Sequence, residues 1–127
     1  MSEEECQEGT TWESSLIATH HKLDNLVAII DNNKKQTLGL TKDILSLDNL
    51  GMIFEAFNWD VNVIDGHSFE DILNAINAAM IPGKPRMIIA NTTKGKGVEF
   101  MEKDSSGWHN AIPSEEQFKG WIEELTR

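Results

Sequence analysis

The chain has 127 residues, of which 39% are hydrophobic and 25% are charged, and this composition is that of an ordinary globular domain with one core. Its formal net charge of −10 opposes nucleic-acid binding, although a metal, a helix N-terminus or a few placed bases can still hold an anionic cofactor. No apolar run approaches the roughly 20 residues of a membrane span, and residues 1–5 are acidic, unlike the apolar core of a signal peptide. The single Cys6 can form no internal disulfide. We therefore expect a cytoplasmic protein that enters no membrane.

The first part of the chain predicts a helix, a strand and a second helix. Residues 10–23 carry apolar residues at helical spacing, and a threonine can cap the start of this helix. Its predicted buried face consists of Trp12, Leu16, His20 and Leu23. The unbroken apolar run at 26–30 is typical of a strand covered on both faces. Residues 32–45 are polar and irregular, and residues 47–57 predict the second helix.

The rest of the chain predicts two more strands, each followed by a helix. The strands fall at 59–64 and 87–90. Ser68 is the predicted N-cap of the helix between them. The apolar stripe of this helix consists of Phe69, Ile72, Leu73, Ile76 and Met80. A long connection at 92–113 then leads to the last helix, where Ser114 and Gln117 match a capping box.

Helices that alternate with apolar strands predict an α/β fold. We expect residues 1–127 to form a single domain built on a partial parallel sheet with helices on both faces. Three strands make a small sheet, and the predicted chain begins with a helix. Both points indicate part of a larger α/β domain, so we expect uncovered apolar faces and association of the isolated chain.

The candidate chemistry lies where the predicted strands end. Residues 31–33 (Asp-Asn-Asn), 65–67 (Asp-Gly-His) and 91–96 follow the strands, and ligands of parallel sheets bind at that edge. Their oxygens, imidazole and ammonium groups suit a hard metal and a diphosphate. Each piece also has a structural interpretation: Asn32 and Asn33 as a turn, His67 as a surface residue, and residues 94–97 as a solvated loop that lacks the P-loop spacing.

Several short stretches, read in order, carry a further signal. They are Cys6-Gln7-Glu8-Gly9, Trp12-Glu13, the run from His20 to Leu26, Asp31-Asn32-Asn33-Lys34, Asp43-Ile44-Leu45, Ile64-Asp65-Gly66-His67, the run from Thr93 to Val98, and Trp108-His109. Together they resemble the thiamine-diphosphate-binding domain of the transketolase family, and most closely the N-terminal subunit of split transketolases. The likeness runs along nearly the whole chain and corresponds to the C-terminal half of that subunit.

The resemblance implies an enzyme part that transfers a two-carbon ketol unit between sugar phosphates, using thiamine diphosphate and Mg²⁺ or Ca²⁺. It assigns the side chain of Asn33 and the backbone carbonyl of Lys35 to the metal, and Glu8 to a subunit interface near the cofactor. It assigns His67 to cofactor binding and catalysis, beside the diphosphate and the substrate channel. A pyrimidine-binding transketolase subunit is the implied partner, in a homo- or hetero-oligomer.

The chain departs from the family at its start, where the family has Gly-Asp-Gly. Glu3 stands in place of the metal-binding aspartate, and Ser2 and Glu4 stand in place of the glycines that let a backbone approach a diphosphate. Two alternatives to the enzyme part therefore remain open. One is a non-catalytic, truncated transketolase paralogue that folds or dimerises without cofactor, and the other is a small nucleotide-binding α/β domain. Alone, the chain is expected to be inactive.

Overall fold

The computed structural model describes residues 1–103 and 108–126. The three strands of the central sheet alternate with helices along the chain, as the sequence predicts, and short extra elements lie between them. In chain order they are the 3₁₀ turn η1 (Glu4–Gln7), α1 (Gly9–His20), β1 (Val27–Asn32), β2 (Lys35–Gln36), β3 (Gly39–Leu40), α2 (Thr41–Ile44), α3 (Leu50–Ala56), β4 (Asp60–Asp65), α4 (Phe69–Asn77), β5 (Arg86–Asn91), α5 (Glu99–Lys103) and α6 (Glu115–Leu125).

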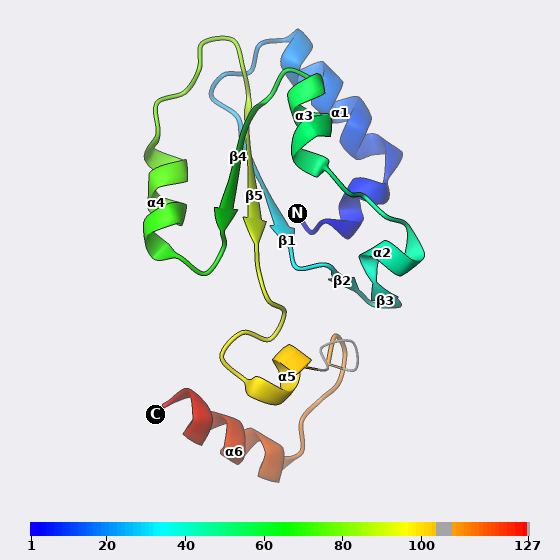
Figure 1. Ribbon diagram of the computed structural model, residues 1–127, viewed down its shortest axis with the longest axis vertical. Coiled ribbons are helices and arrows are strands. Elements are labelled where there is room, and N and C mark those ends of the chain that lie inside the picture. The colour runs from blue at the N-terminus through cyan, green and yellow to red at the C-terminus, as the bar shows by residue number, and fades with distance from the viewer. Residues whose placement is uncertain (104–107, 127) are drawn as a thin grey trace.

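A parallel sheet of three strands forms the centre of the fold, in the order β1-β5-β4. Helices α1 and α3 lie on one side of it and α4 lies on the other (Figure 1). In register, Ile88 of β5 lies between Ile29 of β1 and Asn62 of β4. The predicted α/β class, with a parallel sheet and helices on both faces, is confirmed.

The first three residues extend this sheet, which the sequence analysis did not predict. The Met1 amino group donates to the Ile29 carbonyl (2.8 Å), the Asp31 amide donates to the Met1 carbonyl (2.9 Å) and the Glu3 amide donates to the Asp31 carbonyl (3.1 Å). An isolated parallel bridge joins Ser2 to Asp31. Residues 1–3 therefore run beside β1 and bring Glu3 to the carboxyl end of that strand.

The core lies between the sheet and the pair α1 and α3. Its buried members are Cys6, Ala18, Ile30, Leu50, Phe54, Trp59, Met87 and Ile89. The indole N–H of Trp59 donates to the carbonyl of Ser15 at 3.2 Å, which ties α1 to the start of β4. Gly51 of α3 packs close to the sheet, since a Cβ there would meet Val63, Val61 and Ile89 at 3.7–3.8 Å.

The predicted buried face of α1 is correct at Trp12, which packs against the core beside Phe54, and wrong at the other three positions. Ser15 and Ala18 are the buried residues of this helix, and His20 is exposed. Leu16 is 53% exposed and Leu23, beyond the helix, is 39% exposed. Ser15 and Ala18 are small where the helix approaches Trp59 closely, and Leu16 and Ile17 are left on the outside.

Two other apolar patterns also differ from the prediction. In β1, Val27 and Ile29 remain exposed, so the strand is covered on one face only. In α4, Phe69 is 84% exposed and Ala75 is the buried residue. Uncovered apolar faces were expected and are present, because one helix is too narrow to cover three strands. Association of the isolated chain stays a prediction.

The two segments predicted to be irregular both contain short elements. Residues 32–45 include the antiparallel pair β2 and β3 and the short helix α2, and residues 92–113 include α5. Two capping predictions are confirmed: the Ser68 hydroxyl accepts from the Asp71 amide, and Ser114 and Gln117 form the reciprocal capping box of α6. The predicted threonine cap of the first helix is wrong, because α1 already begins at Gly9 and its N-cap residue is Glu8, whose side chain forms no cap bond. Within the described residues, no helix combines the length and the hydropathy that crossing a bilayer requires.

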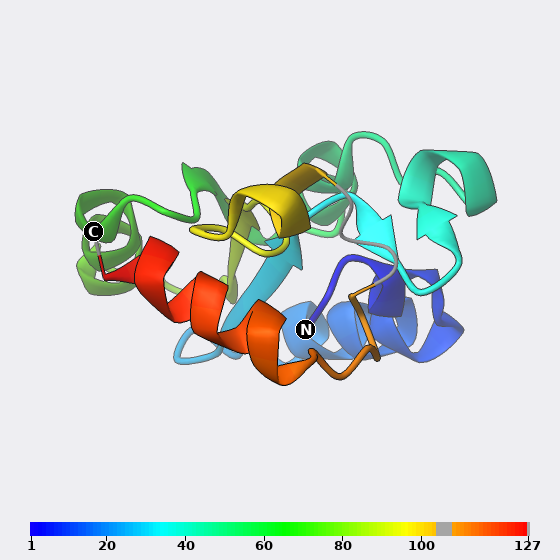
Figure 2. The same ribbon diagram turned by 90° about the horizontal axis from the view of Figure 1, so that it is seen from below.

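Beyond the carboxyl ends of the strands, α5 and α6 form a small unit of their own. Figure 2, seen from that end, shows both helices in front of the sheet. Phe100 stacks on Trp121 with ring centroids 4.7 Å apart, and Trp108 meets both rings edge-on at 5.1 Å. This aromatic cluster gives the C-terminal helices a local core over the edge where the candidate residues lie.

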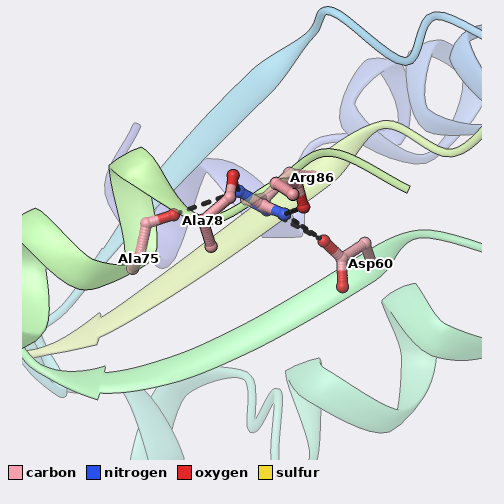
Figure 3. A network of polar contacts seen from close by, with 5 residues as sticks. Asp60, Ala75, Ala78 and Arg86 are labelled. Atoms are coloured by element: carbon pink, nitrogen blue, oxygen red, sulfur yellow. Dashed lines mark hydrogen bonds and ion pairs between the residues drawn. The ribbon is translucent and has the colours of Figure 1, made fainter. Parts of the chain in front are cut away.

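At the opposite end of the sheet, Arg86 is a buried arginine that joins three elements (Figure 3). Its guanidinium contacts a carboxylate oxygen of Asp60 on β4 at 2.8 Å. It also donates to the carbonyls that end α4, those of Ala75 (3.2 Å), Ala78 (2.7 Å) and Ala79 (2.6 Å). One side chain therefore satisfies carbonyls that a helix end leaves without partners.

We predict that Arg86→Ala lowers the free energy of unfolding by about 3–5 kcal/mol, because it leaves a largely buried carboxylate and helix carbonyls unpaired. Arg86→Lys should lose less, since it keeps the charge but not the forked donors. Urea unfolding measures both. The matched control is Lys119→Ala, which breaks the exposed Glu115–Lys119 pair (3.0 Å) and should leave the midpoint unchanged. Equal stability of Arg86→Ala and wild type would contradict the role of Arg86.

Candidate functional site

The carboxyl ends of the three strands meet in one hydrogen-bonded edge, as the sequence predicts. The side-chain amide of Asn32 donates to the Asn91 side-chain oxygen at 2.7 Å, and the Thr92 hydroxyl donates to the Asp31 carboxylate. The Gly66 amide donates to the Asn91 carbonyl at 2.8 Å. A Cβ at Gly66 would clash with the Thr92 side chain, so this turn needs a glycine.

His67 lies on this edge with its ring fixed by the backbone. Its own amide donates to the Asp65 carboxylate at 2.8 Å, and its Nε2 accepts from the Thr93 amide at 2.7 Å. Because Nε2 is the acceptor, the neutral ring carries its proton on Nδ1. The side chain is exposed, so Nδ1–H is available as a donor to a ligand.

Asn33 and Lys35 form a tight turn directly after β1. The Asn33 side-chain oxygen accepts from the Lys35 amide at 3.0 Å, and its amide group donates to Asp31 at 3.2 Å. Lys34 between them has a left-handed backbone, with φ of 63°. Among the described residues one donor contacts the Asn33 oxygen, which leaves it a second lone pair.

Glu3 also lies at this edge and is buried, with 2% of its surface exposed, although a carboxylate is rarely buried without a charged partner. Its Oε1 accepts from the Thr41 hydroxyl, while its Oε2 is buried and has no hydrogen-bond partner among the described residues. Next to it lies a cavity of about 320 Å³. The cavity is lined by Glu3, Lys34, Leu40, Thr41, Lys42, Ser46, Leu47, Asp48 and Leu50.

Sequence reasoning missed Thr41. The residue is 38 positions from Glu3 along the chain, and a threonine in a polar segment carries no signal of this contact. Its amide donates to the Lys34 carbonyl at 3.1 Å, so the start of α2 is tied both to Glu3 and to the turn after β1.

Glu8 lies apart from these contacts. It is the exposed residue that precedes α1, and its side chain does not cap the helix. The structure leaves the carboxylate of Glu8 at the surface, and its assignment to a subunit interface stays a prediction.

The glycine-rich loop at 94–97 binds a carboxylate of the chain itself. The Gly97 amide donates to the Glu102 carboxylate at 2.9 Å, and Lys96 lies 3.6 Å from the same carboxylate. The bond from Gly97 lowers the pKa of Glu102 below its usual range. Lys94 Nζ lies 3.1 Å from Nδ1 of His109, which links this loop to the chain beyond α5. These contacts agree with a structural loop rather than a phosphate cradle.

A metal at this edge would need more than carboxylates and histidines. Over residues 1–103 and 108–126, no group of three His, Cys, Asp or Glu side chains could hold a metal ion. Amide and carbonyl oxygens would have to complete the coordination, and hard cations such as Mg²⁺ or Ca²⁺ accept them. Glu3, Asn33 and the Lys35 carbonyl offer oxygens of the kind that such a cation accepts, and Glu3 Oε2 is a buried oxygen without a partner among the described residues.

Comparison with known proteins gives a consistent result. Residues 1–121 match the family described as the thiamine diphosphate binding domain of transketolase. The chain is 40% identical over 121 residues to one subunit of the apulose-4-phosphate transketolase of Actinobacillus succinogenes, covering 95% of this chain and 44% of that protein. It is also 40% identical over 124 residues to a subunit of the 6-deoxy-6-sulfo-D-fructose transketolase of Clostridium sp., covering 97% and 45%.

The fold is similar to that of solved transketolases. The structure from Campylobacter jejuni matches with a TM-score of 0.88 at 34% identity, over 98% of this chain and 20% of that one. The structure from Leishmania mexicana matches with a TM-score of 0.84 at 25% identity, over 99% and 19%. The chain thus spans less than half the length of each relative named here.

Cys6 holds the turn that carries Glu3, and its thiol is shielded from solvent. The Cys6 amide donates to the Glu3 carbonyl at 3.1 Å, and its side chain is fully buried. Burial raises the pKa of the Cys6 thiol from 9.0 to about 11. We expect Ellman's reagent near neutral pH to modify Cys6 only as fast as the protein opens, and rapidly in denaturant.

The same shift predicts how stability changes with pH. Between about pH 9 and 11 the unfolded thiol loses its proton while the folded thiol keeps it, so this group favours unfolding as the pH rises. The Cys6→Ala variant should lack this part of the alkaline decline in urea unfolding. Rapid labelling of the native thiol would show that the turn around Cys6 is open in solution.

Proposed function

The chain belongs to the transketolase family, as part of its thiamine diphosphate binding domain, and we propose that it holds the diphosphate end of that cofactor together with a divalent metal. The observation that carries the proposal is the Oε2 atom of Glu3, a buried carboxylate oxygen that lacks a partner among the described residues. Buried charges in proteins are paired or bind metals, so this oxygen calls for a cation.

Three groups of this chain would bind the metal. Glu3 supplies a carboxylate, Asn33 its side-chain oxygen and Lys35 its backbone carbonyl, a set of hard ligands suited to Mg²⁺ or Ca²⁺. They come from neighbouring segments, because Glu3 lies beside β1 and the other two follow its carboxyl end. Thiamine diphosphate, when bound, supplies the carbanion-stabilising chemistry of the reaction.

His67 and Glu8 would act around the metal site. The Thr93 amide donates to Nε2 of His67, and we propose that the Nδ1–H on the other side of the ring donates to a phosphate oxygen or a substrate hydroxyl. Glu8 is exposed before α1, where a second subunit can reach it. These are the catalytic, cofactor-binding and interface roles that we propose for the two residues.

The complete reaction would be the transfer of a two-carbon ketol unit between sugar phosphates. It needs the rest of the cofactor-binding domain and a pyrimidine-binding subunit, in a homo- or hetero-oligomer. Two relatives are named for ketoses that carry a phosphate or a sulfo group, which supports an anionic sugar as substrate. The expected cytoplasmic location stays a prediction.

One observation favours a second candidate, a non-catalytic paralogue. The family's glycine after the metal-binding residue is Glu4 here, and a carboxylate at that position repels a diphosphate. The Thr41 hydroxyl also occupies one oxygen of Glu3. In this alternative the buried carboxylate serves the fold alone and the chain binds no cofactor.

Isothermal titration with thiamine diphosphate and Mg²⁺ separates the two candidates. We expect the wild-type chain, mixed with a pyrimidine-binding transketolase subunit, to bind the cofactor in a Mg²⁺-dependent manner. The triple variant Ser2→Gly, Glu3→Asp, Glu4→Gly should bind about tenfold more tightly, because it removes a charge that opposes the diphosphate.

The control is Glu115→Gln on α6, which changes the net charge equally and should leave the affinity unchanged. Absence of binding by the wild type, alone and with the subunit, would reject the proposed function. If the triple variant then binds, residues 2–4 are the cause of the loss and the non-catalytic candidate is favoured.

A further inference from the structure

The hydrogen bond between Thr41 and Glu3 is a feature that the family resemblance does not imply. Both residues are buried, with 5% and 2% of their surfaces exposed. The hydroxyl of Thr41 reaches Oε1, and the amide of the same residue holds the Lys34 carbonyl at 3.1 Å. Thr41 therefore connects the Glu3 carboxylate with the turn that carries Asn33 and Lys35.

The contact also restricts the position of the Glu3 carboxylate. A glutamate has one more rotatable bond than the aspartate it replaces, so its carboxylate has more positions to occupy. A hydrogen bond to one oxygen removes this freedom and leaves the second oxygen in a fixed place. Such bonds from neighbouring groups orient metal ligands in many proteins.

The second oxygen is left in an unfavourable state. Oε2 is buried without a donor, and within the described residues no lysine or arginine forms an ion pair with Glu3. A buried carboxylate with half of its oxygens unpaired destabilises the fold. A cation at Oε2 would remove this cost, so its binding would be linked to folding.

The surroundings of Glu3 suit a cation that carries an anion. Lys34 and Lys42 line the same cavity of about 320 Å³ and have exposed side chains. With the exposed carboxylate of Asp48, the lining holds two ammonium groups and two carboxylates, so it offers partners to a cation and to its phosphate ligands. A metal–diphosphate pair satisfies both kinds of charge.

We propose that Thr41 is a positioning residue, which holds Oε1 of Glu3 so that Oε2 receives a divalent cation bound to a diphosphate, and that this binding stabilises the fold. The inference rests on the proposed function, because it takes the cation to be the one that accompanies the cofactor.

Thermal unfolding with Mg²⁺ and inorganic pyrophosphate tests the proposal without requiring activity. We expect this pair to raise the midpoint of the wild type by about 3–6 °C, which corresponds to modest ligand saturation in a domain of this size. Thr41→Ser keeps the hydroxyl and should keep the shift. Thr41→Val has the same shape without the hydroxyl and should lose it. Thr37→Val, at an exposed threonine between β2 and β3, is the control and should behave as wild type.

A second variant keeps the test decisive if Thr41→Val does not fold. Glu3→Gln removes the buried charge, so it should raise the midpoint without ligand by about 2–5 °C and abolish the response to Mg²⁺ and pyrophosphate. A lower ligand-free midpoint for Glu3→Gln would overturn the idea of an uncompensated carboxylate.

The outcomes separate this inference from the proposed function. If the wild type binds Mg²⁺ with thiamine diphosphate by titration, and a folded Thr41→Val variant shows the full thermal shift, then only the role of Thr41 is wrong. If the wild type shows neither the thermal shift nor binding by titration, then both proposals fall.

Discussion

Parallel pairing of β5 with a strand on each side is the constraint on which the rest of the fold depends. From Arg86 to Ala90 every residue of β5 is buried, so its backbone groups must find partners in neighbouring strands rather than in water. β1 and β4 supply these partners in parallel register. Parallel strands end at the same edge, and this brings the segments after β1, β4 and β5 together as a candidate site.

The two ends of the sheet differ in how their buried polar groups are satisfied. At the amino end, the Arg86 guanidinium contacts a carboxylate and three helix carbonyls, and this end serves stability. At the carboxyl end and the adjoining hairpin, the structure leaves Glu3 Oε2, Asn32 Oδ1 and Gln36 Nε2 buried without partners among the described residues. Unsatisfied groups are costly, and their concentration at one end supports the proposal of a ligand site there.

Part of the candidate site followed from sequence alone. Asn33 and His67 were expected at the carboxyl edge because they lie within three residues of the ends of predicted strands, and a strand end is a local feature of the chain. Their roles stay predictions. Thr41 and the pairing of residues 1–3 with β1 were not found, because each depends on a contact between segments far apart in sequence. The buried faces of α1 and α4 were partly mispredicted for the same reason: apolar spacing marks an amphipathic helix, but neighbours decide which residues it buries.

The sequence by itself determined the α/β class, the order of the main helices and strands, the caps at Ser68 and Ser114, and the family. These depend on local periodicity, capping chemistry and ordered motifs, which are readable along the chain. Only the tertiary structure decided that Glu3 is buried, with one oxygen held by Thr41 and the other without a partner in the part of the chain that the structure describes. Burial and hydrogen bonding arise when distant segments pack together, so no local pattern encodes them.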